Sequence, residues 1–287
     1  MANMMDIFPA LVCPAAWGKL MVCTDGSDEG QNAVAVTLEL AQACDSQVFA
    51  VQVLQIIPEF QAVAPDLRAT LGKGVQENMA VIQAAADKLG VSLQTVTPQG
   101  QSPHAAIVAA AEKLHPELII MGRCGKSALA RILMGNVTAR VIGHSPLNVL
   151  VVPRGGMVGF QRILVASDGS PHSDAAWKLA LAMAKRAKSQ LIGVAVAPEK
   201  ANILEAKAIV QGMLTAADQA GVPFKGVTPQ GVAPDDGIVQ QAIKHEVDLI
   251  IVGSYGRTGL KKLLMGSVTE RVIGRSPCPI LVVKQPV

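Results

Sequence analysis

The chain has 287 residues, of which 50% are hydrophobic, 16% are charged and 3% are aromatic. This composition excludes intrinsic disorder, which requires low hydrophobicity and high charge, and disfavours a single-stranded nucleic-acid platform, which needs aromatic side chains for stacking. The net charge of +3 is too small to indicate a polyanionic partner. No apolar run approaches the roughly 18 residues that span a bilayer, so we expect neither a nucleic-acid partner nor a membrane partner.

The first 17 residues are interpreted as an N-terminal extension. We do not expect a secretory signal, because no basic residue precedes the apolar residues and Pro9 and Pro14 interrupt them. The five cysteines are odd in number, scattered and without a C-x-x-C pair: Cys13, Cys23, Cys44, Cys124 and Cys278. This pattern favours reduced thiols and a cytoplasmic location over a disulfide framework or a zinc site.

Short hydrophobic runs alternate along the chain with Ala-rich stretches of helical spacing, such as residues 32–44 and 174–187. The runs predicted as strands are 20–23, 48–53, 93–96, 118–121, 149–152, 163–166, 191–196, 224–227, 249–252 and 280–283. Alternating strands and helices predict right-handed crossovers and a mostly parallel sheet covered on both faces. Continuous hydrophobic runs are typical of such buried strands.

The chain contains two copies of one domain. Residues 122–146 align without gaps on 253–277, with 14 of 25 positions identical and an offset of 131. Asp-Gly-Ser at 25–27 recurs at 168–170 with an offset of 143, so the first copy holds an insertion of 12 residues between about 54 and 75. We interpret the insertion, near Pro58–Leu71, as an ordinary loop, with a lid or a partner surface as alternatives. Two tandem doubly wound α/β domains, each with a five-stranded parallel sheet, are therefore predicted at 18–153 and 160–287, joined by a linker at 154–159.

Ligands of doubly wound sheets bind beyond the carboxyl ends of the strands, where the strand order reverses, so the loops after strands one and four are the candidate sites. The loop after the fourth strand reads Gly, two residues, Gly, nine residues, Gly and then a helix in both copies. Glycines permit positive φ and close approach of a ligand, and a helix start directs N–H groups at an anion. We predict Asn136 and Ser267 as the N-cap residues. The alternative is that the glycines only form turns.

This spacing resembles the ATP-binding motif of the universal stress protein family, fully in the second copy and with Asn136 in place of Ser or Thr in the first. The resemblance covers about residues 18–153 and 160–287. It implies a Rossmann-like, adenine nucleotide alpha hydrolase-like fold and ATP as the ligand, with or without Mg²⁺. It also implies that the last strands of the two copies, 149–152 and 280–283, pair as a pseudo-dimer. A homodimer of chains is expected in addition.

The resemblance implies a role for each matching residue. An Asp and the residue before it contact the nucleoside, a Val lies against the adenine, and the glycines and the helix start hold the phosphates. In the second copy these are Ser167, Asp168, Val196, Gly253, Gly256, Gly266, Ser267, Val268 and Thr269. In the first copy they are Thr24, Asp25, Val53, Gly122, Gly125, Gly135 and Asn136. An Asp near a triphosphate must bond a ribose hydroxyl or share a metal ion; alternatively it is a turn residue.

The two copies are not expected to bind equally. Residues 1–153 carry 9 basic and 12 acidic residues, whereas residues 154–287 carry 16 basic and 10 acidic ones. Asn136 also brings a bulky amide where the motif has a small hydroxyl. We therefore expect the second site to bind nucleotide better than the first. The basic residues of the two loops, which are Arg123, Lys126, Arg131, Arg257, Lys261 and Lys262, are assigned no role.

No catalytic constellation is present, since the sequence lacks G-x-S-x-G and H-E-x-x-H and its five histidines have no metal-ligand spacing. We assign no catalytic residue and no metal ligand, and we interpret His172 as a surface residue near a helix start. The leading interpretation is a cytosolic, ATP-binding, non-enzymatic stress-response module. The alternatives are a dimerising or partner-binding scaffold without nucleotide, and a slow ATPase.

Overall fold

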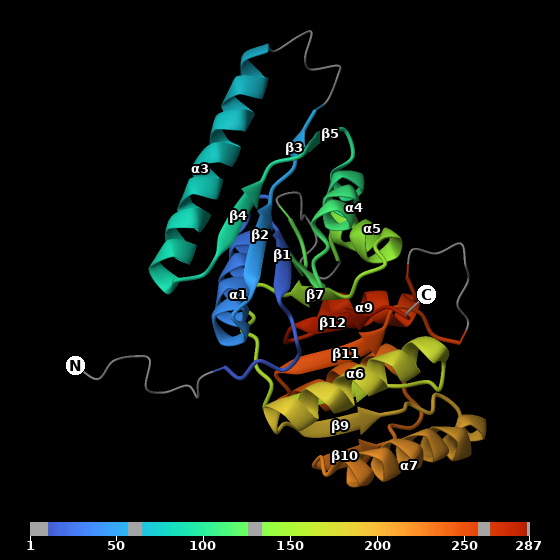
Figure 1. Ribbon diagram of the computed structural model, residues 1–287. Coiled ribbons are helices and arrows are strands. Elements are labelled where there is room, and N and C mark those ends of the chain that lie inside the picture. The colour runs from blue at the N-terminus through green and yellow to red at the C-terminus, as the bar shows by residue number, and fades with distance from the viewer. Residues whose placement is uncertain (1–10, 57–64, 126–133, 258–264, 286–287) are drawn as a thin grey trace.

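The computed structural model describes residues 11–56, 65–125, 134–257 and 265–285. Ten strands form a single sheet in which the two copies lie edge to edge (Figure 1). In the first copy the strands are β1 (Lys19–Cys23), β2 (Gln47–Val51), β4 (Leu93–Val96), β6 (Leu118–Gly122) and β7 (Val149–Val152). In the second copy they are β8 (Arg162–Ala166), β9 (Gln190–Val194), β10 (Phe224–Val227), β11 (Leu249–Gly253) and β12 (Ile280–Val283). All ten predicted strands are confirmed.

The order across the sheet is β10-β9-β8-β11-β12-β7-β6-β1-β2-β4. Each copy is therefore a doubly wound, Rossmann-like α/β unit of five parallel strands, as predicted. The direction of winding reverses between its first and fourth strands, which is where such folds bind ligands. Two short strands, β3 (Leu54–Gln55) and β5 (Gln99–Gly100), pair with each other outside the main sheet.

The two copies meet through their last strands. β7 and β12 run antiparallel, with Val151 opposite Ile280, Leu150 opposite Leu281 and Val149 opposite Val282. This pairing confirms the predicted pseudo-dimer within one chain. It also makes the sheet continuous from one copy to the other.

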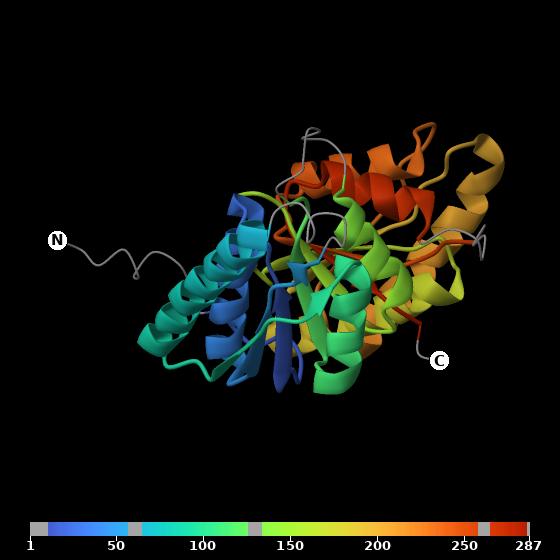
Figure 2. The same cartoon turned by 90° about the horizontal axis from the view of Figure 1, so that it is seen from above.

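Helices cover both faces of the sheet (Figure 2). The helices on one face are α1 (Asp28–Cys44), α3 (Pro65–Leu89), α6 (Pro171–Ala187) and α7 (Ile203–Ala220). Those on the other are α4 (Pro103–Leu114), α5 (Asn136–His144), α8 (Pro234–Lys244) and α9 (Ser267–Arg275). Strand residues alternate between two apolar cores, with Leu20 and Val22 in one and Met21 and Cys23 in the other. Within the described residues, none of these helices is long and apolar enough to cross a bilayer.

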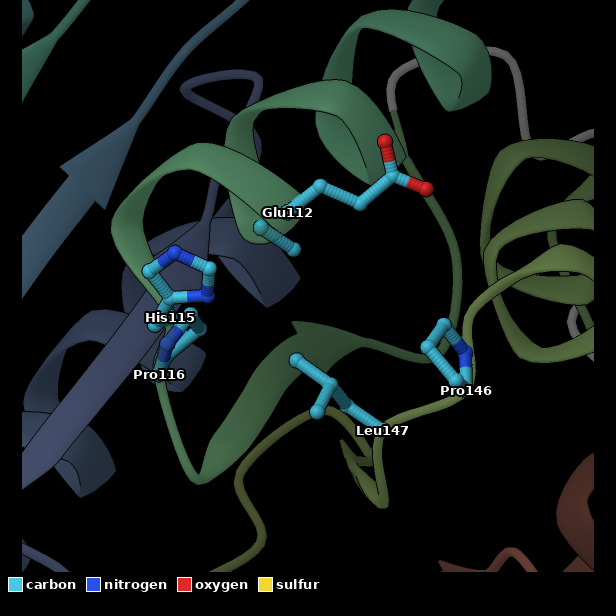
Figure 3. Close-up of a pocket in the computed structure, with 6 residues that line it drawn as sticks. Glu112, His115, Pro116, Pro146 and Leu147 are labelled. Atoms are coloured by element: carbon cyan, nitrogen blue, oxygen red, sulfur yellow. The ribbon is translucent and has the colours of Figure 1, made fainter. Parts of the chain in front are cut away.

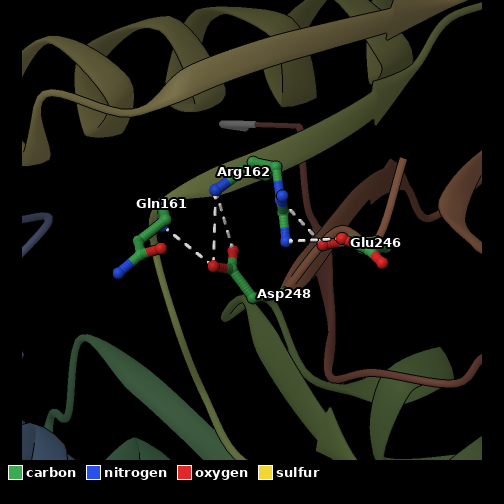
Figure 4. A network of polar contacts seen from close by, with 4 residues as sticks. All are labelled: Gln161, Arg162, Glu246 and Asp248. Carbon is green, nitrogen blue, oxygen red and sulfur yellow. Dashed lines mark hydrogen bonds and ion pairs between the residues drawn. The ribbon is translucent and has the colours of Figure 1, made fainter. Parts of the chain in front are cut away.

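In the second copy, acidic residues join the amino ends of neighbouring strands (Figure 4). Asp248, just before β11, accepts hydrogen bonds from the backbone N of Gln161 at 3.0 Å and of Arg162 at 3.2 Å. The Arg162 side chain donates to the carbonyl of Glu246 at 2.9 Å and pairs with the Glu246 carboxylate at 3.3 Å. This network therefore ties the start of β8 to the start of β11.

The expectation of five reduced thiols is wrong for one pair, because Cys13 and Cys44 form a disulfide. The chain before β1 passes the end of α1, where the carbonyl of Gly18 accepts from the backbone N of Gln47 at 2.9 Å. This contact between the N-terminal segment and the end of α1 has no signature in the cysteine spacing. Cys23 and Cys278 are buried, and burial raises the pKa of each thiol to about 12.

The insertion in the first copy is only partly a loop, so that prediction is corrected. Helix α3 begins at Pro65 and has 25 residues, whereas its counterpart α7 has 18. Proline is favoured in the first turn of a helix, because its fixed φ suits the start and its missing N–H is not needed there. The rest of the insertion, residues 57–64, lies outside the described residues.

Candidate functional site

In the second copy the first strand, β8, ends in a tight turn that leads directly into α6. Gly169 has φ 77°, a backbone conformation that favours glycine. Ser170 is the N-cap of α6, and its hydroxyl accepts from the backbone N of Ser173 at 3.3 Å. Asp168 accepts from the backbone N of Ser170 at 3.0 Å. The turn therefore holds the Asp168 carboxylate at the carboxyl edge of the sheet.

The glycines of the second loop permit close contacts within the protein. A Cβ on Gly253 would lie 2.7 Å from the backbone carbonyl carbon of His172, and one on Gly256 would lie 2.6 Å from Oδ2 of Asp168. A Cβ on Gly266 would lie 3.4 Å from Cα of Tyr255. None of the three glycines has a positive φ, so the freedom of glycine to adopt a left-handed conformation is not used here. Their missing side chains instead let the loop pack against the turn after β8.

Helix α9 begins one residue earlier than predicted. Its N-cap is Gly266, with φ −66° and ψ 137°, so Ser267 is the first helical residue and the predicted N-cap role of Ser267 is wrong. The backbone O of Gly266 accepts from Glu270 N at 3.0 Å. The hydroxyl of Thr269 is buried and donates to the carbonyl of Gly253 at 2.9 Å, which ties the helix start to the end of β11. These contacts position the helix start without an N-cap side chain.

Helix α5 in the first copy begins in the same way. Gly135 is its N-cap, so the predicted N-cap role of Asn136 is also wrong, and Asn136 is exposed as the first helical residue. Thr138 donates to the carbonyl of Gly122 at 3.0 Å. The helix start and the end of β6 are therefore joined as in the second copy.

The remaining contacts of the first loop also match those of the second. A Cβ on Gly122 would lie 2.9 Å from the backbone carbonyl carbon of Glu29, and one on Gly125 would lie 2.4 Å from Oδ2 of Asp25. Asp25 accepts from the backbone N of Ser27 at 3.0 Å. Each copy therefore brings its Asp, its glycine loop and its helix start together.

In each copy the predicted nucleoside contacts lie at the carboxyl ends of the strands, as its glycine loop does. The hydroxyl of Thr24 accepts from Gly26 N at 3.1 Å, and the hydroxyl of Ser167 lies 3.1 Å from that of Ser173. Val53 and Val196 are half-buried and lie two residues beyond the ends of β2 and β9. The structure thus gives both valines apolar neighbours in the core that includes α4, α5, α8 and α9. Val268, in the first turn of α9, packs against the same core.

Asp168 is held as a carboxylate by surrounding donors. Its Oδ2 accepts from the backbone N of Arg257 at 2.8 Å. Burial opposes ionisation, but hydrogen bonds from Ser170, Arg257 and Ser173 outweigh it and lower the pKa of Asp168 below its ordinary value. The guanidinium of Arg257 pairs with Glu205 of α7 at 2.6 Å.

The clearest difference between the two loops lies in the residue that each helix presents to them. Glu29, in the first turn of α1, accepts a hydrogen bond from the backbone N of Cys124 at 2.5 Å. Its counterpart in α6 is His172, whose ring lies edge-on to Tyr255 with centroids 5.3 Å apart. His172 therefore contacts the loop, which the expectation of a surface residue did not include. Glu29 was missed because an acidic residue in the first turn of a helix is explained by the helix dipole alone.

The two copies are also connected by side chains across the pseudo-dimer. Arg123, in the first loop, donates to the carbonyls of Gly274 at 3.3 Å and Ser276 at 3.4 Å, at the end of α9. Lys284, after β12, donates to the carbonyl of Ile142 near the end of α5. Burial lowers the pKa of Lys284 to about 8. Each helix that follows a glycine loop thus has a cation from the other copy at its carbonyl end, the favourable end for positive charge.

Four of the basic residues in the two loops fall outside the described residues: Lys126, Arg131, Lys261 and Lys262. Among the residues that the structure describes, no three His, Cys, Asp or Glu side chains gather to hold a metal ion. A Mg²⁺ ion bound here would therefore take most of its ligands from phosphate oxygens and water, as Mg²⁺ commonly does.

A cavity of about 390 Å³ lies in the first copy, at the amino ends of β6 and β7 (Figure 3). Its walls come from the end of α4 and from the segments that precede β6 and β7. The lining residues are Ala111, Glu112, His115, Pro116, Pro146 and Leu147. None of these lining residues belongs to either glycine loop, so this cavity is separate from the candidate site.

The profile of the Universal stress protein family matches residues 16–153 and 159–284. A universal stress protein of Methanocaldococcus jannaschii is 34% identical over 140 residues, which cover 47% of this chain and 82% of that protein. One from Mycobacterium tuberculosis is 30% identical over 185 residues, covering 59% of this chain and 62% of that protein.

Among solved structures, a universal stress protein from Archaeoglobus fulgidus shares the fold with a TM-score of 0.75 and 21% identity. The match covers 95% of this chain and 100% of that one. The long structural match and the two family matches agree with the repeat found in the sequence and with the two equivalent halves of the ten-stranded sheet. The chain therefore belongs to the universal stress protein family and carries two copies of its domain in tandem.

Proposed function

We propose that this protein is an ATP-binding stress-response module whose main nucleotide site is the glycine loop of the second copy. The observation that carries the proposal is the connected unit formed by Asp168, Gly256 and the start of α9. A Cβ on Gly256 would overlap the Asp168 carboxylate, and Thr269 ties the helix start to β11. The position of this unit at the winding reversal is where doubly wound folds bind nucleotides.

The unit has the chemistry that an adenine nucleotide requires. The first N–H groups of a helix have no partner within it, and the helix dipole places positive potential at the same point. Ser267 is exposed at this point, so its hydroxyl is available to a phosphate together with the N–H groups of Val268 and Thr269. The ionised Asp168 suits a ribose hydroxyl, which donates a hydrogen bond, better than it suits a phosphate. The positive charge of the second half adds a favourable field for a polyanion.

The first copy supports a second role for part of the molecule. Its loop has the same backbone contacts, but a carboxylate already accepts from Cys124 N. We propose that this half acts mainly as a dimerising scaffold, through β7, for the half that binds nucleotide. We propose further that two chains associate as a homodimer, which light scattering of the purified protein measures directly.

The test is ATP titration of matched variants at the first helical residue of each copy. Ser267→Glu places a negative charge at the start of α9, where Glu favours the helix but repels phosphate. Asn136→Glu makes the same change at the start of α5 and serves as the control. We expect Ser267→Glu to weaken ATP binding at least about tenfold, which corresponds to about 1.4 kcal/mol, and Asn136→Glu to leave the main site intact.

Two further measurements complete the test. Denaturing the purified protein should release ATP or AMP, and a time course of added ATP separates a binding protein from a slow ATPase. If the wild-type protein binds no adenine nucleotide, the proposal fails. Equal losses in the two Glu variants would remove the assignment of the main site to the second copy.

A further inference from the structure

The first glycine loop already holds an anionic ligand from its own chain. Glu29 Oε2 accepts from the backbone N of Cys124 at 2.5 Å, and Cys124 lies between Gly122 and Gly125. This short charge-assisted hydrogen bond is the type that a loop N–H makes with a phosphate oxygen. The carboxylate thus occupies a donor of the loop that an incoming anion would need.

The second copy has no carboxylate at this position. The counterpart of Glu29 is His172, and the counterpart of Cys124 is Tyr255. The two rings lie edge-on with centroids 5.3 Å apart. An imidazole carries no negative charge in either protonation state, so His172 brings no carboxylate to the second loop.

The described charges around Glu29 include two further carboxylates. The nearby Asp28 is paired with Arg154 at 2.8 Å, and the Asp25 carboxylate lies against Gly125. The guanidinium of Arg123 donates to the carbonyls at the end of α9 and also acts on the side chain of Cys124. Within the described residues, the first loop therefore meets two carboxylates, and its cation is shared with the other copy.

We propose that Glu29 is a specificity-determining residue that closes the first glycine loop to polyphosphates, while His172 leaves the second loop open to them. This inference deepens the proposed function and rests on it. A phosphate can reach Cys124 N only by displacing Glu29, and the displaced carboxylate then stays close to it. Repulsion between like charges at about 4 Å predicts a weakening of binding by about tenfold to a thousandfold.

The test uses the full-length protein and NMR signals of two backbone amides, Cys124 for the first loop and Tyr255 for the second. The probes are inorganic tripolyphosphate and ATP. Glu29→Gln removes the charge but keeps an acceptor of the same shape, and Glu29→His supplies the residue of the second copy. The reciprocal variant His172→Glu supplies the residue of the first copy.

In the wild-type protein we expect tripolyphosphate to shift Tyr255 and to leave Cys124 unchanged. In Glu29→Gln and Glu29→His, Cys124 should respond, with an apparent affinity at least about tenfold above the upper limit that the wild-type titration sets. In His172→Glu, the response of Tyr255 should weaken by a similar factor. Unchanged signals from the rest of the chain establish that each variant is folded. If one of the two Glu29 variants fails to fold, the other still provides the test.

Two results would overturn the inference. One is a Cys124 response to tripolyphosphate that is the same in the wild type and in both Glu29 variants, and the other is the lack of any Cys124 response in all three. A failure of Tyr255 to respond to ATP in the wild type is a separate result, because it contradicts the proposed function. The Cys124 comparison is read from a different loop with a simpler anion, so the two failures are distinguishable.

Discussion

The two glycine loops have the same backbone contacts and different chemistry. In each, a glycine lies against an Asp carboxylate and a Thr hydroxyl ties the helix start to the fourth strand. They differ at Glu29 and His172, which lie outside the glycine spacing in another part of the chain. The spacing therefore specifies how the loop packs, and side chains from the neighbouring helix decide which ligand it accepts.

The largest expected effect tests whether the first glycine of each loop is needed for the fold itself. Gly253→Ala places a Cβ 2.7 Å from backbone atoms of α6, and Gly122→Ala places one 2.9 Å from backbone atoms of α1. Because backbone cannot move aside cheaply, each should lower the free energy of unfolding by about 3 kcal/mol, without any ligand. Denaturant unfolding measures the loss.

Gly212→Ala is the matched control, because nothing lies within 4 Å of its added Cβ in α7. It should be neutral or stabilise the protein by up to about 1 kcal/mol, since Ala is the better helix former. If Gly253→Ala behaved like this control, a purely ligand-binding role for the glycine would be favoured.

The second prediction compares the two cations that cap the helices after the loops. The pKa of Lys284 is lowered to about 8, so between pH 8 and 10.5 the unfolded chain binds more protons than the folded one. The free energy of unfolding should therefore rise across this range, by about 2 kcal/mol.

Lys284→Met should flatten this rise in urea titrations made at a series of pH values. Arg123→Met, at the equivalent contact with α9, should leave it unchanged, because arginine does not titrate there. An identical pH profile in the wild type and in Lys284→Met would show that Lys284 is not the group responsible.

The third prediction separates binding in the two copies. Gly256→Ala places a Cβ 2.6 Å from Oδ2 of Asp168, and Gly125→Ala places one 2.4 Å from Oδ2 of Asp25. A displaced Asp168 loses its bond from Arg257 N, so ATP affinity should fall about tenfold, or about 1.4 kcal/mol. Calorimetric titration should find ATP affinity unchanged in Gly125→Ala; a matching loss there would argue against the difference between the copies.

The smallest expected effect concerns the outer helices. His104 and His144 lie with ring centroids 5.2 Å apart between α4 and α5, where the second copy has Asp235 paired with Arg275 at 3.1 Å. Burial, and then the charges of Arg140 and His144, lower the pKa of His104. The unfolded chain therefore takes up this proton at a higher pH, and stability falls slightly as the pH is lowered through about 6.5.

His104→Asn should reduce this fall, as measured by the dependence of Tm on pH between 7 and 5.5. His115→Asn, at the end of α4, is the control and should leave the slope unchanged. A slope that is equal in all three proteins would assign the acid sensitivity to another group.

Much of the fold could be predicted because it follows from local patterns. The hydrophobic runs of the strands are continuous, and the repeat indicates that β7 and β12 are equivalent strands. The errors arise where distant segments meet. The Cys13–Cys44 disulfide depends on the path before β1, and the true N-caps, Gly135 and Gly266, depend on backbone contacts.

The candidate site was only partly predictable for the same reason. The glycines and Asp168 follow from spacing, and the structure brings them together. The contact of Glu29 with Cys124 joins residues that are 95 positions apart. Nothing in the sequence near Glu29 distinguishes it from an acidic residue that simply favours the start of its helix.

The antiparallel β7–β12 pair has a consequence for how such a protein can evolve. In an assembly of two identical chains, every substitution is present in both halves, so a carboxylate that blocks one loop blocks both. Here the halves are covalently linked, so their pairing does not depend on protein concentration, and each is encoded separately. One half is thereby free to lose its ligand while the other keeps it.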